Sequence, residues 1–133
     1  MKKMKRIVLT VTILALFFTG CATENNNEIV VVSREEGSGT RGAFIELFGI
    51  EEKDSNGNKV DKTTDEATVV NSTSVVMTTV AGNKNSIGYI SLGSLNDTVK
   101  AVKVDGVEPT VENIKNNTYK VFRPFNIATR DDI

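Results

Sequence analysis

Four residues with the chemistry of an anion site lie close together in the first third of the chain: Arg34, Ser38, Gly39 and Thr40. An arginine guanidinium presents a planar fork of N–H donors that matches an oxyanion, and a lysine does not. Hydroxyl and backbone N–H groups from the other three add further donors. The spacing therefore predicts a site for phosphate or a similar oxyanion. Arg41, one step further on, is a secondary candidate that faces either the ligand or solvent.

The flanking sequence predicts the elements that position these residues. An apolar, β-branched run at residues 29–32 is typical of a buried strand. A glycine-rich turn follows, and Ser38 is a good N-cap for a helix that Gly49 would end. The first turn of a helix has N–H groups without internal partners, and its dipole favours negative charge. Strand, turn and helix together predict an anion site at the helix start.

Apolar residues of this helix recur at helical spacing: Ala43, Phe44, Leu47 and Phe48. We expect Phe44, Leu47 and Phe48 to face the sheet and Glu46 to face water. A competing interpretation of the whole stretch is an ordinary capped helix behind a strand, with Arg34 on the surface.

The remainder of the chain predicts an α/β domain with a mixed or parallel sheet flanked by helices. Charged residues 51–65 are expected to form an exposed loop or hairpin tip, and Gly88 indicates a close backbone approach. The dipeptide Asp105-Gly106 is a hairpin signal, and Thr110 can cap a helix. Strands are predicted at residues 67–70, 86–91, 99–104 and 120–128, and helices at residues 75–80 and 111–115. The β-branched content of residues 75–80 makes a strand the alternative there.

The amino-terminal segment has the pattern of an export signal. Residues 1–20 combine a basic start with an apolar run at 7–18, and Phe18-Thr19-Gly20-Cys21 resembles a bacterial lipoprotein box. We expect residues 1–20 to be a lipoprotein signal peptide, Cys21 to be lipidated, residues 21–28 to be a polar tether and residues 29–130 to fold. The alternative is a free thiol behind an ordinary signal peptide. Localisation on the outer face of the cell membrane follows from lipidation.

Charge and composition exclude several classes of function. The chain has 16 basic and 17 acidic residues, and without residues 1–20 the count is 12 basic and 17 acidic, a formal charge of −5. This balance argues against a nucleic-acid partner. The sequence contains no histidine, no metal-ligand cluster and no nucleophile–base pair, so neither a cofactor nor hydrolytic catalysis is predicted.

The motif Arg34-x-x-x-Ser38-Gly39-Thr40 resembles the second-lobe motif of the phosphate-binding proteins of bacterial ABC phosphate transporters. Residues 87–91 and 123–129 are similar to that family too, and the resemblance spans residues 28–129. It implies one lobe of a type 2 periplasmic-binding-protein-like fold, with strands near Ile29 and Phe125 crossing to a second lobe. It also implies a binding protein and not an enzyme, with inorganic phosphate, an ABC transporter permease and a complementary lobe as partners.

Two further functions compete with this interpretation. Gly37-x-Gly39-x-x-Gly42 is a literal dinucleotide-binding pattern between a strand and a helix. That fingerprint also requires an acid at the end of the second strand, where this chain has Asn71. The other alternative is a surface interaction module that has lost ligand binding, because half a cleft leaves an oxyanion open to water on one side.

Overall fold

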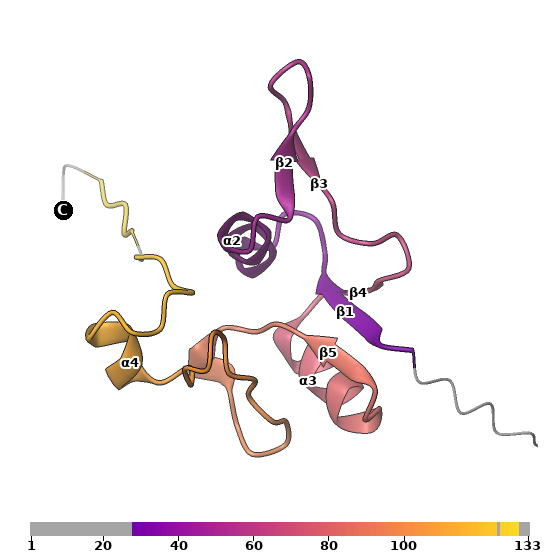
Figure 1. The fold of residues 1–133 in the computed structure, drawn as a ribbon, viewed down its shortest axis with the longest axis vertical. Coiled ribbons are helices and arrows are strands. Elements are labelled where there is room, and N and C mark those ends of the chain that lie inside the picture. The colour runs from indigo at the N-terminus through magenta and orange to yellow at the C-terminus, as the bar shows by residue number, and fades with distance from the viewer. Residues whose placement is uncertain (1–27, 125, 131–133) are drawn as a thin grey trace, which may run out of the picture.

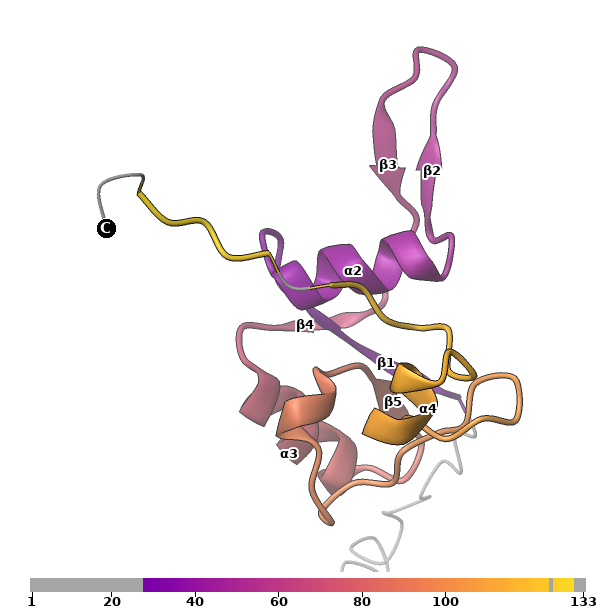
Figure 2. The ribbon, with the colours of Figure 1, turned by 90° about the vertical axis from the view of Figure 1, so that its left-hand side faces the viewer.

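The computed structural model describes residues 28–124 and 126–130 (Figure 1). The predicted signal peptide, Cys21 and most of the tether lie outside the described residues. Within these ranges no helix has the length and apolar character needed to cross a membrane. The predicted α/β architecture is confirmed, since a parallel sheet packs with helices and a separate antiparallel hairpin projects from it (Figures 1 and 2).

Three strands form the parallel sheet in the order β4-β1-β5, with β1 in the centre. Their bounds are Val30–Arg34 for β1, Thr68–Val70 for β4 and Ser86–Gly88 for β5. Val32 pairs with Thr68 on one side and with Gly88 on the other. The strands predicted near residues 29, 67 and 86 are therefore confirmed, although the third ends earlier than expected.

Helix α3, Thr73–Gly82, covers one face of the sheet and contributes Val76 and Met77 to the core. Val32 and Val76 are almost fully buried. A Cβ atom at Gly88 would lie 2.9 Å from Val76 Cγ1 and 3.2 Å from the carbonyl oxygen of Val32. The predicted close approach at Gly88 is confirmed, because only glycine lets the helix and the strand come this near.

Helix α2, Gly39–Leu47, starts at Ser38 as predicted, and Gly49 follows it with φ of +66°. The prediction for its buried face is wrong. Ile45 is the buried residue at 7% exposure, whereas Leu47 and Phe48 are 40% and 43% exposed. Glu46 is exposed, as expected.

Phe44 of α2 and the C-cap residue Phe48 pack on each other, and Phe44 also packs on Tyr89, directly after β5. Phe44 stacks on Tyr89 with ring centroids 4.1 Å apart, and its centroid lies 4.7 Å from that of Phe48. Both phenylalanines line an apolar groove of about 440 Å³ between α2, α3 and the segment after β5. Offset and stacked ring pairs add stabilisation beyond the area that they bury. The apolar spacing was correctly predicted to be helical, but Phe44 packs on the ring of Tyr89.

The exposed segment after α2 forms a hairpin from β2, Glu51–Lys53, and β3, Lys59–Asp61. This confirms the predicted hairpin tip, where Asp54 accepts hydrogen bonds from the backbone N–H groups of Asn56 and Asn58 at 2.8 Å each. The predicted capping of α4, Val111–Lys115, by Thr110 is also confirmed. A short 3-10 helix, η2, occupies Leu92–Ser94.

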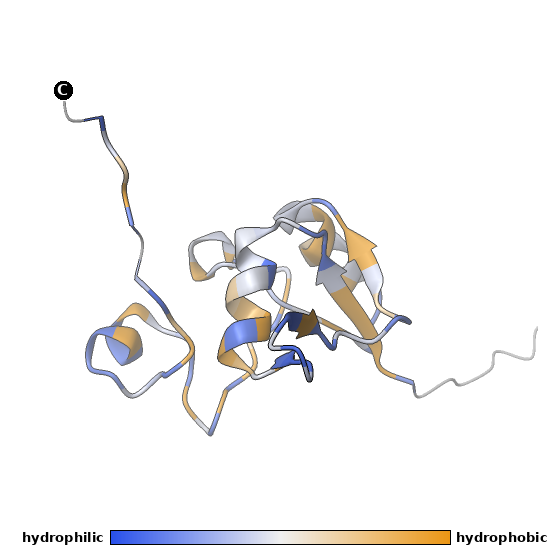
Figure 3. Ribbon diagram, turned by 90° about the horizontal axis from the view of Figure 1, so that it is seen from above, coloured by the Kyte–Doolittle hydropathy of each residue, from blue (hydrophilic) through white to orange (hydrophobic). Residues whose placement is uncertain are grey.

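Two predicted strands are absent from the described residues. At 99–104 the structure has a single bridge between Val104 and Val107, although Asp105 and Gly106 both have positive φ and form the expected turn. Described residues of 120–128 form no strand and leave the body of the domain (Figure 3). A strand needs a ladder partner, and Arg123 instead contacts Glu46 and the carbonyl of Gly39 on α2.

The packing of α2 predicts a contrast between two neighbouring apolar side chains. Ile45→Ala should lower the free energy of unfolding by about 2–5 kcal/mol, because it removes a buried side chain. Leu47→Ala, at an exposed position, should change it by roughly 0.5 kcal/mol or less. Urea unfolding followed by circular dichroism measures both values. Equal losses would mean that α2 presents a different face to the sheet.

Candidate functional site

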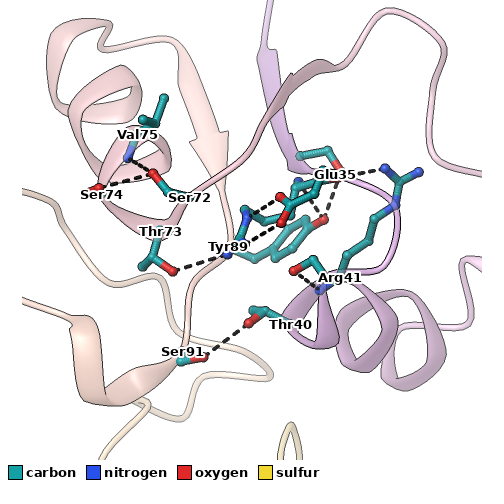
Figure 4. Close-up of polar contacts among 12 residues, drawn as sticks. Glu35, Thr40, Arg41, Ser72, Thr73, Ser74, Val75, Tyr89 and Ser91 are labelled. Atoms are coloured by element: carbon teal, nitrogen blue, oxygen red, sulfur yellow. Dashed lines mark hydrogen bonds and ion pairs between the residues drawn. The ribbon is translucent and has the colours of Figure 1, made fainter.

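The candidate site lies where the three parallel strands end. Because the strands are parallel, their carboxyl ends meet at one edge of the sheet, the usual position of ligands in open α/β folds. β1 leads through a short turn into α2, β4 leads into α3, and β5 leads into Tyr89 and η2. Polar side chains from all three junctions contact one another there (Figure 4).

Tyr89 completes the end of β1. The β1–β5 pairing stops at Val32 and Gly88, so the N–H of Arg34 points toward β5 beyond the last pair. The Tyr89 hydroxyl accepts a hydrogen bond from this N–H at 3.0 Å and lies 2.8 Å from Ser33 Oγ. Ser33 is 1% exposed, and the contact satisfies a polar group that would otherwise be costly to bury. Tyr89 therefore fixes the backbone from which Arg34 projects.

The side chain of Arg34 is only 13% exposed. Glu35 and Thr73 hold its guanidinium at the edge of the sheet. Its Nε and Nη2 donate to the two carboxylate oxygens of Glu35 at 2.8 and 2.9 Å, and its Nη1 donates to Thr73 Oγ1 at 3.2 Å. The hydrogen bonds between the pair raise the pKa of Arg34 and lower the pKa of Glu35, because each favours the charged form. Both groups are therefore charged at neutral pH.

The start of α2 brings the other predicted residues to the same edge. Ser38 is the N-cap, and its Oγ accepts from the N–H of Arg41 at 3.3 Å. The backbone N–H groups of Gly39 and Thr40 belong to the first turn, so the helix itself offers them no carbonyl partner. Thr40 Oγ1 lies 3.3 Å from Ser91 Oγ, a hydroxyl from the segment after β5. The structure thus brings Arg34, Ser38, Gly39 and Thr40 together.

Arg41 is engaged elsewhere. Its Nε and Nη2 donate to Asp61 Oδ2 at 2.9 and 2.7 Å, and its Nη1 donates to the carbonyl of Arg34 at 2.7 Å. This guanidinium joins α2 to the end of β1 and to β3. All three nitrogens of its side chain bind protein groups. Contact between Arg41 and a ligand remains a prediction.

Asp61, the last residue of β3 in the hairpin, forms an ion pair with Arg41. Burial alone would raise its pKa, but hydrogen bonds from Thr63 and then from Arg41 outweigh burial, so the pKa of Asp61 lies below its usual value. Thr63 donates through its N–H at 2.8 Å and its hydroxyl at 2.6 Å. The carboxylate is therefore held in its charged form by several donors.

Sequence reasoning missed three residues that contact the site: Thr73, Tyr89 and Ser91. Thr73 lies just after β4, and the position itself carried a signal, because loops at the carboxyl ends of parallel strands converge. Tyr89 and Ser91 lie in residues 87–91, for which the sequence offers only a resemblance to a family. No local pattern predicts their contacts, which join residues more than 50 positions apart.

Comparison with known proteins identifies the family of this chain. A family model described as a PBP superfamily domain matches residues 6–132. The chain belongs to the PBP superfamily. The predicted periplasmic-binding-protein-like fold class is thereby confirmed.

Individual proteins are similar to this chain over most of its length. The chain is 58% identical over 116 residues to phosphate-binding protein PstS 2 of Streptococcus agalactiae serotype V, a match that covers 84% of this chain and 40% of that protein. A solved phosphate-binding protein of a phosphate ABC transporter from Streptococcus pneumoniae has a TM-score of 0.66 at 50% identity, covering 68% of this chain and 35% of that one.

A third relative has a ligand in its structure. It is described as a phosphate ABC transporter substrate-binding protein with bound phosphate from Clostridium perfringens, and its TM-score is 0.59 at 47% identity. That match covers 69% of this chain and 35% of the solved chain. This PBP superfamily chain thus spans well under half the length of the relatives that it matches.

The ion pair of Arg41 with Asp61 predicts a pH-dependent contribution to stability. Asp61→Asn should lower the free energy of unfolding at pH 7 by about 1.5–3 kcal/mol, the range for hydrogen bonds to charged groups. Because the folded pKa of Asp61 is depressed, this contribution is complete above the unfolded pKa of about 3.9 and is lost as the pH falls through the folded pKa.

Urea unfolding of wild type and variant between pH 7 and pH 2 measures this difference. The exposed Asp65→Asn serves as the control for loss of a surface charge and should stay within about 0.5 kcal/mol of wild type throughout. A gap between wild type and Asp61→Asn that is constant down to pH 2 would contradict the assignment.

Proposed function

We propose that this chain is a phosphate-binding lobe of an extracytoplasmic receptor for ABC-type uptake. The observation that carries the proposal is the position of Arg34, whose guanidinium is anchored to the start of α3 at the sheet edge from which β1 leads into the first turn of α2. A guanidinium fork and free helix-start N–H groups are complementary to a tetrahedral oxyanion. Ser38, Gly39 and Thr40 would donate hydroxyl and N–H hydrogen bonds to it.

The names of the relatives support phosphate as the ligand, and the chemistry of the site supports binding without catalysis. In the described ranges, no group of three or more histidine, cysteine, aspartate or glutamate residues is arranged to hold a metal ion. The full sequence contains no histidine to act as a base. A binding protein, with no enzyme activity and no cofactor, is therefore the function proposed.

The remaining partners follow from the same proposal. Cys21 would carry the lipid that anchors the chain outside the cell, residues 21–28 would be the tether, and residues 29–130 the lobe. A complementary lobe would close over the oxyanion, and a transporter permease would receive it. With one side open to solvent, the lobe alone should bind phosphate with a dissociation constant near 1 mM, about −4 kcal/mol.

A surface interaction module without a ligand is the second candidate. The observation in its favour is the exposure of apolar residues on the sheet strands, with Val69 at 57% and Ile87 at 48%. The dinucleotide alternative has less support, since β4 ends at Val70 and is followed by Asn71, not by the acid that a ribose would require.

Phosphate titration of the full chain, followed by amide NMR, tests the proposed site. The largest shifts are expected at residues 37–41. Arg34→Lys should weaken binding by about tenfold or more, because lysine keeps the charge but loses the fork. Thr40→Val should weaken it severalfold by removing one donor.

Two substitutions outside the site serve as controls for these variants. Lys103→Arg changes an exposed cation that pairs with Glu108, and Thr78→Val changes a hydroxyl that bonds its own helix. Both should titrate like wild type. If Arg34→Lys also titrates like wild type, or the largest shifts fall elsewhere, the interaction module becomes the better account.

Lipid attachment is tested separately in cells of a bacterium that processes lipoproteins. Metabolic labelling with palmitate should mark the wild-type chain and fail to mark Cys21→Ala, since this is the chain's single cysteine. Equal labelling of both chains would exclude Cys21 as the lipidated residue.

A further inference from the structure

The hydroxyl of Thr73 is not used by the helix that it begins. Ser72 is the N-cap of α3, since its Oγ accepts from the N–H of Val75 at 3.3 Å and lies 3.1 Å from Ser74 Oγ. Thr73, the first helical residue, directs its Oγ1 to Arg34 Nη1 at 3.2 Å (Figure 4). Helix capping therefore does not explain this hydroxyl.

Thr73 and Glu35 hold Arg34 in different ways. Glu35 is adjacent to Arg34 in the sequence, directly after the end of β1, so its contact with the guanidinium is a local one. Thr73 lies 39 positions away at the start of α3, and this helix is anchored in the core through Val76. The contact with Thr73 is thus the one that ties the tip of Arg34 to the rigid scaffold.

The hydrogen bonds of Arg34 leave donors in a defined place. A guanidinium has five N–H donors, and the structure assigns one on Nε, one on Nη2 and one on Nη1 to protein acceptors. One N–H therefore remains on each terminal nitrogen. These two are the donors that a bidentate oxyanion requires, and their direction depends on how the guanidinium plane is held.

We propose that Thr73 is a positioning residue for the oxyanion, which orients the guanidinium of Arg34 through a hydrogen bond from the first residue of α3. The inference rests on the proposed phosphate site and extends it to a second helix and a second strand junction. The β-branched side chain of Thr73 has few rotamers, so its acceptor oxygen is well fixed before the ligand binds. Preorganisation of this kind lowers the entropic cost of binding.

Phosphate titrations of the full chain test the role of the hydroxyl. Thr73→Val keeps the shape and removes the acceptor, so the dissociation constant should rise about three- to tenfold, because the guanidinium keeps its charge but loses one of the contacts that orient it. Thr73→Ser restores an acceptor and should stay within about twofold of wild type. Thr78→Val, the matched control on the same helix, should bind like wild type. Wild-type binding by Thr73→Val would overturn the proposal.

A double-mutant cycle with Arg34→Lys separates positioning from a general loss of structure. If Thr73 acts through the guanidinium, adding Thr73→Val to Arg34→Lys should change the dissociation constant by less than about twofold, because the oriented group is already gone. The same loss in both backgrounds would show that Thr73 acts on the fold and not on Arg34.

A measurement without phosphate distinguishes failure of this inference from failure of the proposed function. The Nε–H resonance of Arg34 should shift and exchange faster with water in Thr73→Val than in wild type or Thr73→Ser. An unchanged resonance would overturn the inference even if phosphate binds. If the resonance responds while wild type binds no phosphate, the proposed function fails and the positioning of Arg34 by Thr73 stands.

Discussion

The hydroxyl of Tyr89 accepts the N–H that the central strand would otherwise leave unpaired. Where β5 stops, the edge of β1 still presents the N–H of Arg34, and the neighbouring Ser33 is buried with its hydroxyl. A buried donor without a partner costs more than an average hydrogen bond contributes. One phenol oxygen satisfies both groups, and its ring stacks on Phe44 of α2. The end of β1, the middle of α2 and the segment after β5 are joined by this single side chain.

The candidate site follows from that junction. With the backbone of Arg34 fixed, its side chain reaches the start of α3, and the turn to α2 brings Ser38, Gly39 and Thr40 to the same edge. Arg41 adds a second fixed point by bonding both the carbonyl of Arg34 and the hairpin acid Asp61. Arg34 and Arg41, seven residues apart, therefore have different structural roles. Arg34 is held at the edge of the sheet by Glu35 and Thr73, whereas Arg41 joins α2 to the end of β1 and to the hairpin.

The sequence predicted the parts of this arrangement that depend on local chemistry. Ser38 and Thr110 as caps, Gly49 after α2 and the turn at Asp105-Gly106 all follow from backbone requirements within a few residues. The three strands of the parallel sheet were likewise found from short apolar runs.

What it did not predict depends on contacts between distant segments. The helical stripe of α2 was correct, but its burial depends on Tyr89, so Ile45 and not Phe48 faces the sheet. Residues 120–128 have strand-like composition, yet a strand also needs a neighbour with a free edge. Residues 71–74, at the start of α3, are all of the capping type, and only the fold shows that Ser72 caps the helix while Thr73 bonds Arg34.

The central claim is that the carboxyl edge of the parallel sheet holds an oxyanion at the start of α2. A crystal structure of the full chain in saturating phosphate tests it most directly. The account predicts tetrahedral density within hydrogen-bonding distance of the N–H groups of Gly39 and Thr40 and of the terminal nitrogens of Arg34. Thr73 should remain bonded to Arg34 in that structure. An empty edge at saturating phosphate, or an ion bound only at another surface, would contradict the account.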